Sequence, residues 1–374
     1  MGKLHGLTIG LDVCSTLHMD VSLDDLDWCL DRVVPAGPAY LIALPSKNDP
    51  MLGYLTTAYS DHVRLREKFG LRVDEKMWAF FKRIGVLDAS GRPTARFGDP
   101  AWVYREYRRR KGDARPDAEI AAEARKKIAD VRGRGVPLAI GYGEKPWDLE
   151  PALDREIRAL YADAKKAIWT TISPAFVAAL PGSVPLRTRS ADRPDYILHP
   201  ESGEALDARS EEAVRALRGR AADFDVQVVV SDGLSALAIT DSGHLAPYLA
   251  QLRASLETNG LRLSPTLLVV TSGRVRAGYR IGETLFGGLA SKGARRTVVH
   301  LIGERPGSMH HTFSAYVTSI TADQWGGAGG GRVDHDVTRV VSGMADTALH
   351  PDAGARETVK ILVAGTAPSR PSPA

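Results

Sequence analysis

The sequence predicts an α/β protein on three observations. A strand, a helix and a second strand are indicated within the first 45 residues. Amphipathic helical patterns then fill the middle of the chain. Strand-like apolar runs alternate with helical patterns again after residue 225. Strands that alternate with helices favour a parallel sheet covered by those helices.

The first strand is expected over Gly6–Val13 and the second over Ala39–Pro45, because both are short apolar runs. Between them, apolar residues recur at helical spacing over Ser22–Val34, with Ser22 as a candidate N-cap. Polar side chains close both strands, with Asp12 at the end of the first and Asp49 after the second.

Helices are expected through the middle of the chain. Residues 55–70 and 74–85 are amphipathic, and each stretch ends in glycine, as many helices do. Residues 117–135 form another helical pattern, and a longer one follows over 148–172. The proline-rich stretch Pro181–Tyr196 is expected to be a loop.

The second half predicts a Rossmann-like three-layer α/β domain. The domains are expected at 1–145, at 146–180 as a connecting helix, at 181–366, and at 367–374 as a disordered tail. Strands are expected over Val226–Val230, Leu263–Val270, Arg296–Ile302, Ser314–Ile320 and Val359–Gly365.

Composition excludes several classes of function. The 374 residues carry a net charge of +4, and the dense basic run Tyr104–Pro116 is more typical of a solvated helix face than of a nucleic-acid site. Two cysteines, Cys14 and Cys29, do not make a disulfide framework. Neither Met309–His311 nor Val333–Asp336 has the spacing of a metal site. Without a signal or an apolar span, a cytoplasmic protein is expected.

Glycine-bearing loops follow three of the expected strands. They are Asp232–Ser235, Gly273–Val275 and Gly303–Gly307. If the strands are parallel, these loops meet at the carboxyl edge of one sheet, where ligands bind in such folds. Glycine permits close approach to the backbone, so a ligand-binding ledge is favoured over three unrelated turns.

The same loops resemble a known family. The segments "VVVSDGLSALAI", "TSGRVRAGYRIGETL" and "HLIGERPGSMHHTFSAYVT", in that order and preceded by "TRSADRPDYILHPESGEAL", resemble the small subunit of adenosylcobalamin-dependent ethanolamine ammonia-lyase. The first half, through "GLTIGLDVCSTLH" and "GRPTARFGDPAWVY", resembles the closing third of the large subunit. That subunit is a TIM barrel, so the two early strands would be its last two.

The resemblance implies roles for individual residues. Asp49 would hold the ammonium group of the substrate, and Val13 would line the substrate pocket. No catalytic residue and no metal ligand is assigned. The implied cofactor contacts are Val275, Glu304, Val337 and Leu87, with Val337 in a setting where the family usually has a different residue.

The resemblance also implies a reaction and a cofactor mode. Bound adenosylcobalamin would drive a radical elimination that converts ethanolamine, or a similar amino alcohol, to an aldehyde and ammonia. No D-x-H-x-x-G segment is present, so base-on binding is expected. The sequence departs from the family at "PSKND" and at Gly53.

Three interpretations stay open from sequence. The chain is one component of a split lyase whose partner carries the N-terminal part of the large subunit, or a non-catalytic cobalamin-binding or assembly protein, or a truncated fragment. A bacterial microcompartment is the alternative to free cytoplasm. The exact substrate and the oligomeric state are undetermined.

Overall fold

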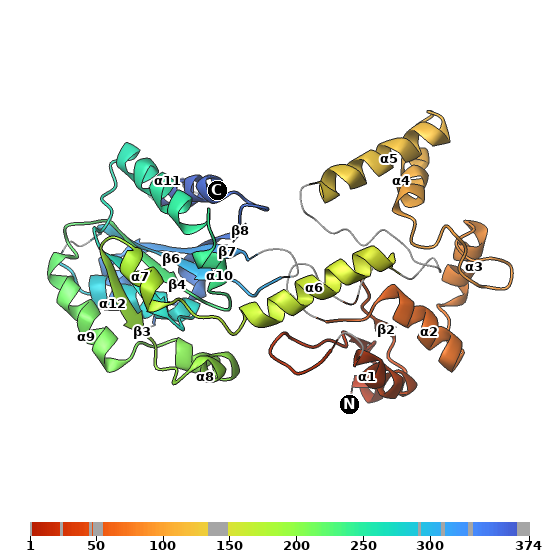
Figure 1. Ribbon diagram of the computed structural model, residues 1–374, viewed down its shortest axis with the longest axis horizontal. Helices are drawn as coiled ribbons and strands as arrows, with labels where there is room; N and C mark the ends of the chain where they lie inside the picture. The colour runs from red at the N-terminus through yellow and green to blue at the C-terminus, as the bar shows by residue number, and fades with distance from the viewer. Residues whose placement is uncertain are drawn as a thin grey trace, which may run out of the picture. The chain divides into compact units, whose positions relative to one another are not determined.

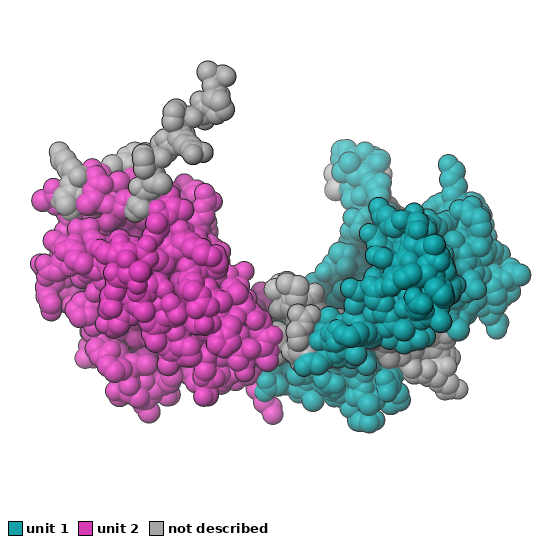
Figure 2. All heavy atoms as spheres, turned by 90° about the horizontal axis from the view of Figure 1, so that it is seen from above, with its two compact units in different colours: residues 1–164, 307–309 teal, residues 165–306, 310–374 magenta. Residues whose placement is uncertain are grey.

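The computed structural model describes residues 2–22, 25–44, 47, 55–133, 149–290, 293–307, 311–327 and 332–364. The chain divides into two compact units, coloured separately in Figure 2. Unit 1 comprises residues 1–164 with 307–309, and unit 2 comprises residues 165–306 with 310–374. The class is mixed α/β, as expected.

Unit 1 contains a small sheet and a series of helices (Figure 1). Gly10 pairs with Tyr40 and Leu11 with Leu41, so the two strands are parallel. The predicted strand–helix–strand unit is therefore confirmed, although each strand has only two residues. The helix between them begins at Leu26 rather than near Ser22. The elements are β1 (Gly10–Leu11), α1 (Leu26–Val33), β2 (Tyr40–Leu41), α2 (Tyr59–Phe69), α3 (Glu75–Arg83), α4 (Pro100–Arg110), α5 (Asp117–Arg132) and α6 (Pro151–Ala167).

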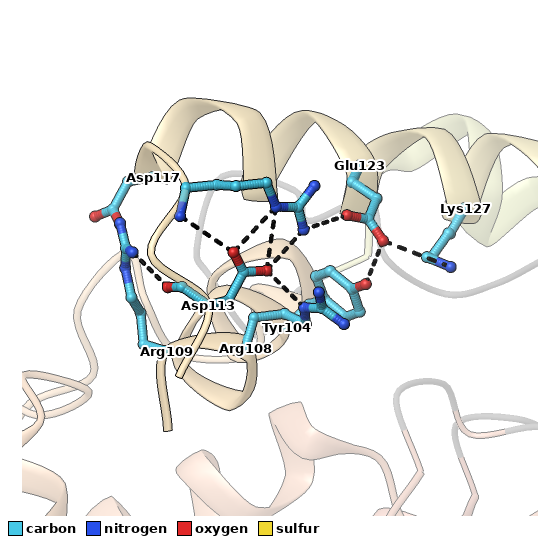
Figure 3. A network of polar contacts seen from close by, with 8 residues as sticks. Tyr104, Arg108, Arg109, Asp113, Asp117, Glu123 and Lys127 are labelled. Atoms are coloured by element: carbon cyan, nitrogen blue, oxygen red, sulfur yellow. Dashed lines mark hydrogen bonds and ion pairs between the residues drawn. The ribbon is translucent and has the colours of Figure 1, made fainter. Parts of the chain in front are cut away.

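The basic run spans the end of α4 and the turn before α5, and several of its arginines pair with carboxylates within unit 1 (Figure 3). The Asp113 carboxylate accepts hydrogen bonds from Arg108 at 2.8 Å and from Arg115 at 2.7 Å. Arg115 also donates to Glu123 at 2.7 Å, and Glu123 accepts the Tyr104 hydroxyl at 2.5 Å. The pairing with Arg115 and Arg108 holds the pKa of Asp113 well below its usual range. These arginines therefore bind the helical hairpin together.

Unit 2 is built on a six-stranded mixed sheet with strand order β3-β5-β4-β6-β7-β8. The first four strands are parallel, and β7 and β8 are antiparallel to their neighbours. The strands are β3 (Ser183–Arg187), β4 (Val226–Ser231), β5 (Leu267–Thr271), β6 (Arg295–Gly303), β7 (Phe313–Thr321) and β8 (Thr338–Met344). The longer helices are α9 (Ala208–Leu217), α11 (Leu245–Thr258), α12 (Val275–Phe286) and α14 (Pro351–Ala364).

Helices cover both faces of this sheet (Figure 1). Alternating residues of β4 enter two separate cores, with Val228 on one face and Val229 on the other. The Val228 side packs against α11 and α14, and the Val229 side against α9 and α12. Strand β4 is buried at all six positions, as expected for a parallel strand between two helical layers.

Two sequence expectations for unit 2 are wrong. Val359–Gly365 is not a strand, because residues through Ala364 belong to α14, which packs along α11. Pro181–Tyr196 is not a continuous loop, because it contains β3 and the short helix α8 (Arg193–Leu198). Strand β8 was not expected at all.

Candidate functional site

The carboxyl ends of β4, β5 and β6 meet at one edge of the unit 2 sheet. The loops that follow are residues 232–235, 272–275 and 303–307, and together they are called the ledge. The amide N–H of Leu234 donates to the Gly303 carbonyl at 2.9 Å, which joins the β4 and β6 loops. The amide N–H of Ser272 donates to Asp232 Oδ1 at 2.7 Å, which joins the β5 and β4 loops. The predicted convergence of the three loops is therefore present.

The ledge glycines are needed for contact between these loops. A Cβ on Gly303 would lie 2.0 Å from the carbonyl oxygen of Ser235 and 2.4 Å from that of Asp232. Gly233 has a φ of +52°, and a Cβ there would lie 2.0 Å from the Gly303 carbonyl oxygen. No side chain fits at such distances. The sequence analysis explained these glycines by the approach of a ligand, whereas the structure explains them by the packing of one loop on another.

A buried carboxylate lies beneath the ledge. The side chain of Asp232 is fully buried, and burial raises its pKa to about 6, against the effect of Arg193 and of backbone N–H donors. Arg193 Nη1 lies 3.8 Å from Asp232 Oδ2, which is an ion pair without a hydrogen bond. Arg193 donates instead to the Gly233 carbonyl at 2.9 Å and to the Ile168 carbonyl at 2.8 Å.

A buried histidine lies one layer deeper. His300 Nε2 and Ser231 Oγ are 2.6 Å apart, and both side chains are inaccessible to solvent. Burial lowers the pKa of His300 to about 4, so the ring is neutral at pH 7. Gly278 of α12 provides the space for it, because a Cβ there would lie 2.5 Å from His300 Nδ1. A Ser–His pair that is closed to solvent supports the sheet and has no access to a substrate.

Tyr196 lies between two guanidinium groups at the ledge. Arg274 and Arg193 lie 4.3 Å and 4.8 Å from its ring centroid. Its hydroxyl donates to the Gly273 carbonyl at 3.1 Å, and Arg274 donates to the Tyr196 carbonyl at 2.8 Å. Cation–π stacking and these bonds attach α8 to the β5 loop.

Glu304 is the acidic side chain of the ledge. Its backbone N–H donates to the Thr312 carbonyl at 2.9 Å, which fixes the chain as β6 ends. The Tyr316 hydroxyl donates to Glu304 Oε1 at 3.2 Å. Burial, and secondarily the charge of Glu304, raises the pKa of Tyr316 above its ordinary value. Glu304 is only partly buried, and Tyr316 is the one side-chain donor to its carboxylate among the described residues.

Val275 and Val337 are brought to the same core as α12. Val275 is the first residue of α12, and Val337 ends the short helix His335–Val337. Both pack against the core between the sheet and α12. Their elements are joined by a 3.0 Å hydrogen bond between the Tyr279 hydroxyl and His335 Nδ1.

The remaining predicted residues belong to unit 1. Val13 follows β1 and is almost fully buried. Leu87 is buried and lines a pocket of about 630 Å³ whose walls include six aromatic side chains and three arginines. Asp49 lies outside the described residues. No three His, Cys, Asp or Glu side chains gather as a metal site within the described ranges.

Neither the Arg193–Asp232 pair nor the buried His300 was predicted, although Asp232 was named in the first ledge loop. Arg193 and Asp232 are 39 positions apart, and no local pattern connects them. His300 had a signal, because it is a titratable residue inside the apolar run Arg296–Ile302 and therefore needs a buried partner.

Comparisons with known proteins match two families to successive parts of the chain. The sequence model of the family described as ethanolamine ammonia-lyase light chain (EutC) matches residues 124–369. The chain belongs to the ethanolamine ammonia-lyase light-chain family. The model of the ethanolamine ammonia-lyase large subunit (EutB) matches residues 1–96. The chain thus joins a large-subunit segment to a light-chain segment.

Individual relatives support both assignments. The ethanolamine ammonia-lyase small subunit of Pseudomonas syringae pv. tomato is 34% identical over 183 residues, which are 46% of this chain and 59% of the relative. That of Xanthomonas campestris pv. campestris is 34% identical over 192 residues, 49% of this chain and 65% of the relative. The large subunit of Escherichia coli K12 is 35% identical over 104 residues, 28% of this chain and 23% of the relative. The chain therefore spans about three fifths of these small subunits and about a quarter of that large subunit.

No helix in the described parts of the chain is both long enough and apolar enough to span a bilayer.

Proposed function

We propose that the chain is a component of an adenosylcobalamin-dependent ethanolamine ammonia-lyase that converts ethanolamine to acetaldehyde and ammonia. The observation that carries this proposal is the presence, in one chain, of a large-subunit segment at 1–96 and a light-chain segment at 124–369. The match spans only 23% of the Escherichia coli K12 large subunit, so a complete large subunit requires further polypeptide. Nothing favours the alternative of a non-catalytic assembly protein.

The proposal includes the finer architecture. Residues 1–145 would contribute the last two strands of a TIM barrel, and residues 146–180 would connect them to a Rossmann-like cobalamin-binding domain at 181–366. The parallel pairing of β1 with β2 supports the first part, and the helices on both faces of the unit 2 sheet support the second. The enzyme would act in the cytoplasm, or within a bacterial microcompartment.

The ledge residues fit a cobalamin. A corrin carries amide side chains, which donate hydrogen bonds, together with an extended apolar face. Glu304 is a partly buried acceptor, and its Oε1 already accepts a hydrogen bond from Tyr316. Val275 and Val337 offer partly exposed apolar surface beside α12. By resemblance, Leu87 of unit 1 is a further proposed cofactor contact. The bound cofactor would supply the radical chemistry, and the protein residues would hold it and exclude water.

Base-on binding is part of the proposal. It rests on the sequence, which contains no D-x-H-x-x-G segment, and His300 beneath the ledge is buried against Ser231 and closed to a cofactor. On the substrate side, Asp49 would hold the ammonium group and Val13 would line the pocket.

The proposed function predicts activity only with the rest of the large subunit. The purified chain with adenosylcobalamin and ethanolamine, or a similar amino alcohol, should release no aldehyde. Addition of the missing part of the large subunit should give acetaldehyde and ammonia in equal amounts. Both products are measured with coupled dehydrogenases. Turnover by the chain alone would refute the requirement for a partner. Inactivity of the assembled complex would refute the proposed ammonia-lyase activity.

Asp49→Ala should weaken amine binding in the reconstituted complex by about 2 kcal/mol, because a charge-assisted hydrogen bond is lost. Cyanocobalamin affinity should not change. The exposed Asp20 provides the control, since Asp20→Ala removes a carboxylate of unit 1 with no proposed role. Equal ethanolamine affinity in both variants would remove Asp49 from the substrate site.

A further inference from the structure

We propose that Asp232 is the positioning residue of the ledge, holding all three loops in the arrangement that binds the cofactor. This inference rests on the proposed function, because it assigns a role in cobalamin binding. Asp232 makes no contact that requires a ligand, and it acts through the loops bonded to it.

One oxygen of Asp232 fixes the β5 loop. Oδ1 accepts the Ser272 amide N–H at 2.7 Å. Ser272 has a φ of 60°, and among the described residues it is the one non-glycine residue with positive φ. This conformation is costly for a side chain that is not glycine or asparagine, so a specific bond must hold it. Val275 follows three residues later and begins α12. The Asp232 carboxylate therefore sets the direction in which that contact residue leaves the sheet.

The other oxygen reaches the β6 loop through Arg193. Oδ2 faces the guanidinium of Arg193 at 3.8 Å. That guanidinium donates to the Gly233 carbonyl at 2.9 Å. Gly233 packs directly on Gly303, which precedes Glu304. The position of Glu304 thus depends on a chain of contacts that begins at Asp232.

Burial makes the loss of any of these contacts costly. Asp232 is fully buried and Arg193 is 8% exposed, so water does not replace a lost partner. The Arg193 Nη2 and Asp232 Oδ2 atoms have no hydrogen bond among the described residues. The pair is therefore held by charge alone, and a neutral isostere removes that attraction while keeping the shape.

The same sheet provides a matched control at its opposite edge. Asp225 precedes β4, and its carboxylate accepts hydrogen bonds from Arg262 at 2.9 Å and from Arg296 at 3.1 Å. Asp225→Asn therefore breaks an aspartate–arginine cluster next to the same strand, but it does so at the amino end, away from the ledge.

The test uses the reconstituted complex and cyanocobalamin as the probe. Asp232→Asn should raise the dissociation constant about tenfold, because the attraction to Arg193 is lost and the Ser272 N–H then donates to a neutral acceptor instead of a charged one. Asp225→Asn should leave the dissociation constant unchanged. If the two variants weaken binding equally, Asp232 has only a general structural role and the proposal is wrong.

Hydrogen exchange in the purified chain tests the contacts between the loops separately from cofactor binding. Asp232→Asn should speed exchange in all three ledge loops, and Asp225→Asn in none of them. Arg193→Gln keeps the acceptor for Ser272, and it should loosen the β4 and β6 loops more than the β5 loop. Unchanged exchange in the Asp232 variant would overturn the positioning role. The Asp232 variant could exchange faster while the parent complex binds no cyanocobalamin. That result would support the loop contacts but refute the proposed function, and with it the role of Asp232 in cofactor binding.

Discussion

Gly303→Ala is expected to lower the free energy of unfolding of unit 2 by about 3 kcal/mol, at the upper end of the usual cost of overpacking. The added Cβ would lie 2.0 Å from the Ser235 carbonyl oxygen and 2.4 Å from that of Asp232. Both neighbours are backbone atoms, so neither can rotate away. The β4 and β6 loops must separate, and the Leu234–Gly303 hydrogen bond breaks with them.

Gly219 is the control for Gly303. It lies in the short helix Arg218–Arg220, and a Cβ there would meet nothing within 4 Å. Gly219→Ala should be neutral, or stabilise unit 2 by about 0.5 kcal/mol through the unfolded state. Urea unfolding by circular dichroism measures both variants. Equal midpoints for Gly303→Ala and Gly219→Ala would show that the ledge can open at little cost.

The tight packing around Gly303 limits the use of this residue in tests of cofactor binding. A bulky substitution at Gly303 would abolish binding by separating the loops, whether or not a ligand contacts the glycine. Loss of binding in such a variant therefore says nothing about direct contact. Substitutions at Glu304, whose carboxylate is half-buried, are more informative.

The sequence predicted the strands of unit 2 that are buried on both faces. Val226–Val230 and Arg296–Ile302 are mainly apolar runs, interrupted by Gln227 and His300, and such runs favour central parallel strands. Both are central strands of the sheet, as β4 and β6. The glycines that follow them predicted a close approach of some other group to the backbone of these loops. The residues did not indicate whether a ligand or another loop requires the glycine.

The errors have physical causes. Val359–Gly365 is a short apolar run, which periodicity alone does not distinguish from a buried helix segment. Ser183–Arg187 contains Pro185, which argues against a central strand, and β3 indeed lies at the edge of the sheet. The Arg193–Asp232 pair has no local signal, because it depends on how α8 packs against the end of β4.

The buried groups beneath the ledge predict opposite pH dependences. For His300, burial lowers the pKa from 6.5 to about 4. Its contribution to stability is complete above pH 6.5 and is lost as the pH falls toward 4, by about 3 kcal/mol at 1.36 kcal/mol per unit. For Asp232, burial raises the pKa from 3.8 to about 6. Its contribution is complete below pH 3.8 and is lost as the pH rises through 6, by a similar amount.

The two contributions nearly cancel in the parent chain between pH 4 and 6.5, so each single variant should reveal the other group. In His300→Gln the remaining Asp232 should make unit 2 more stable as the pH falls. In Asp232→Asn the remaining His300 should make it less stable. Other titrating groups are common to both chains and cancel in the comparison with the parent. Urea unfolding at pH 4, 5, 6 and 7, followed by hydrogen exchange in β4 and β6, measures these slopes. If the two variants depart from the parent slope in the same direction, at least one of these groups is not buried as the structure has it, because a buried neutral histidine and a buried carboxylate shift stability in opposite directions over this range.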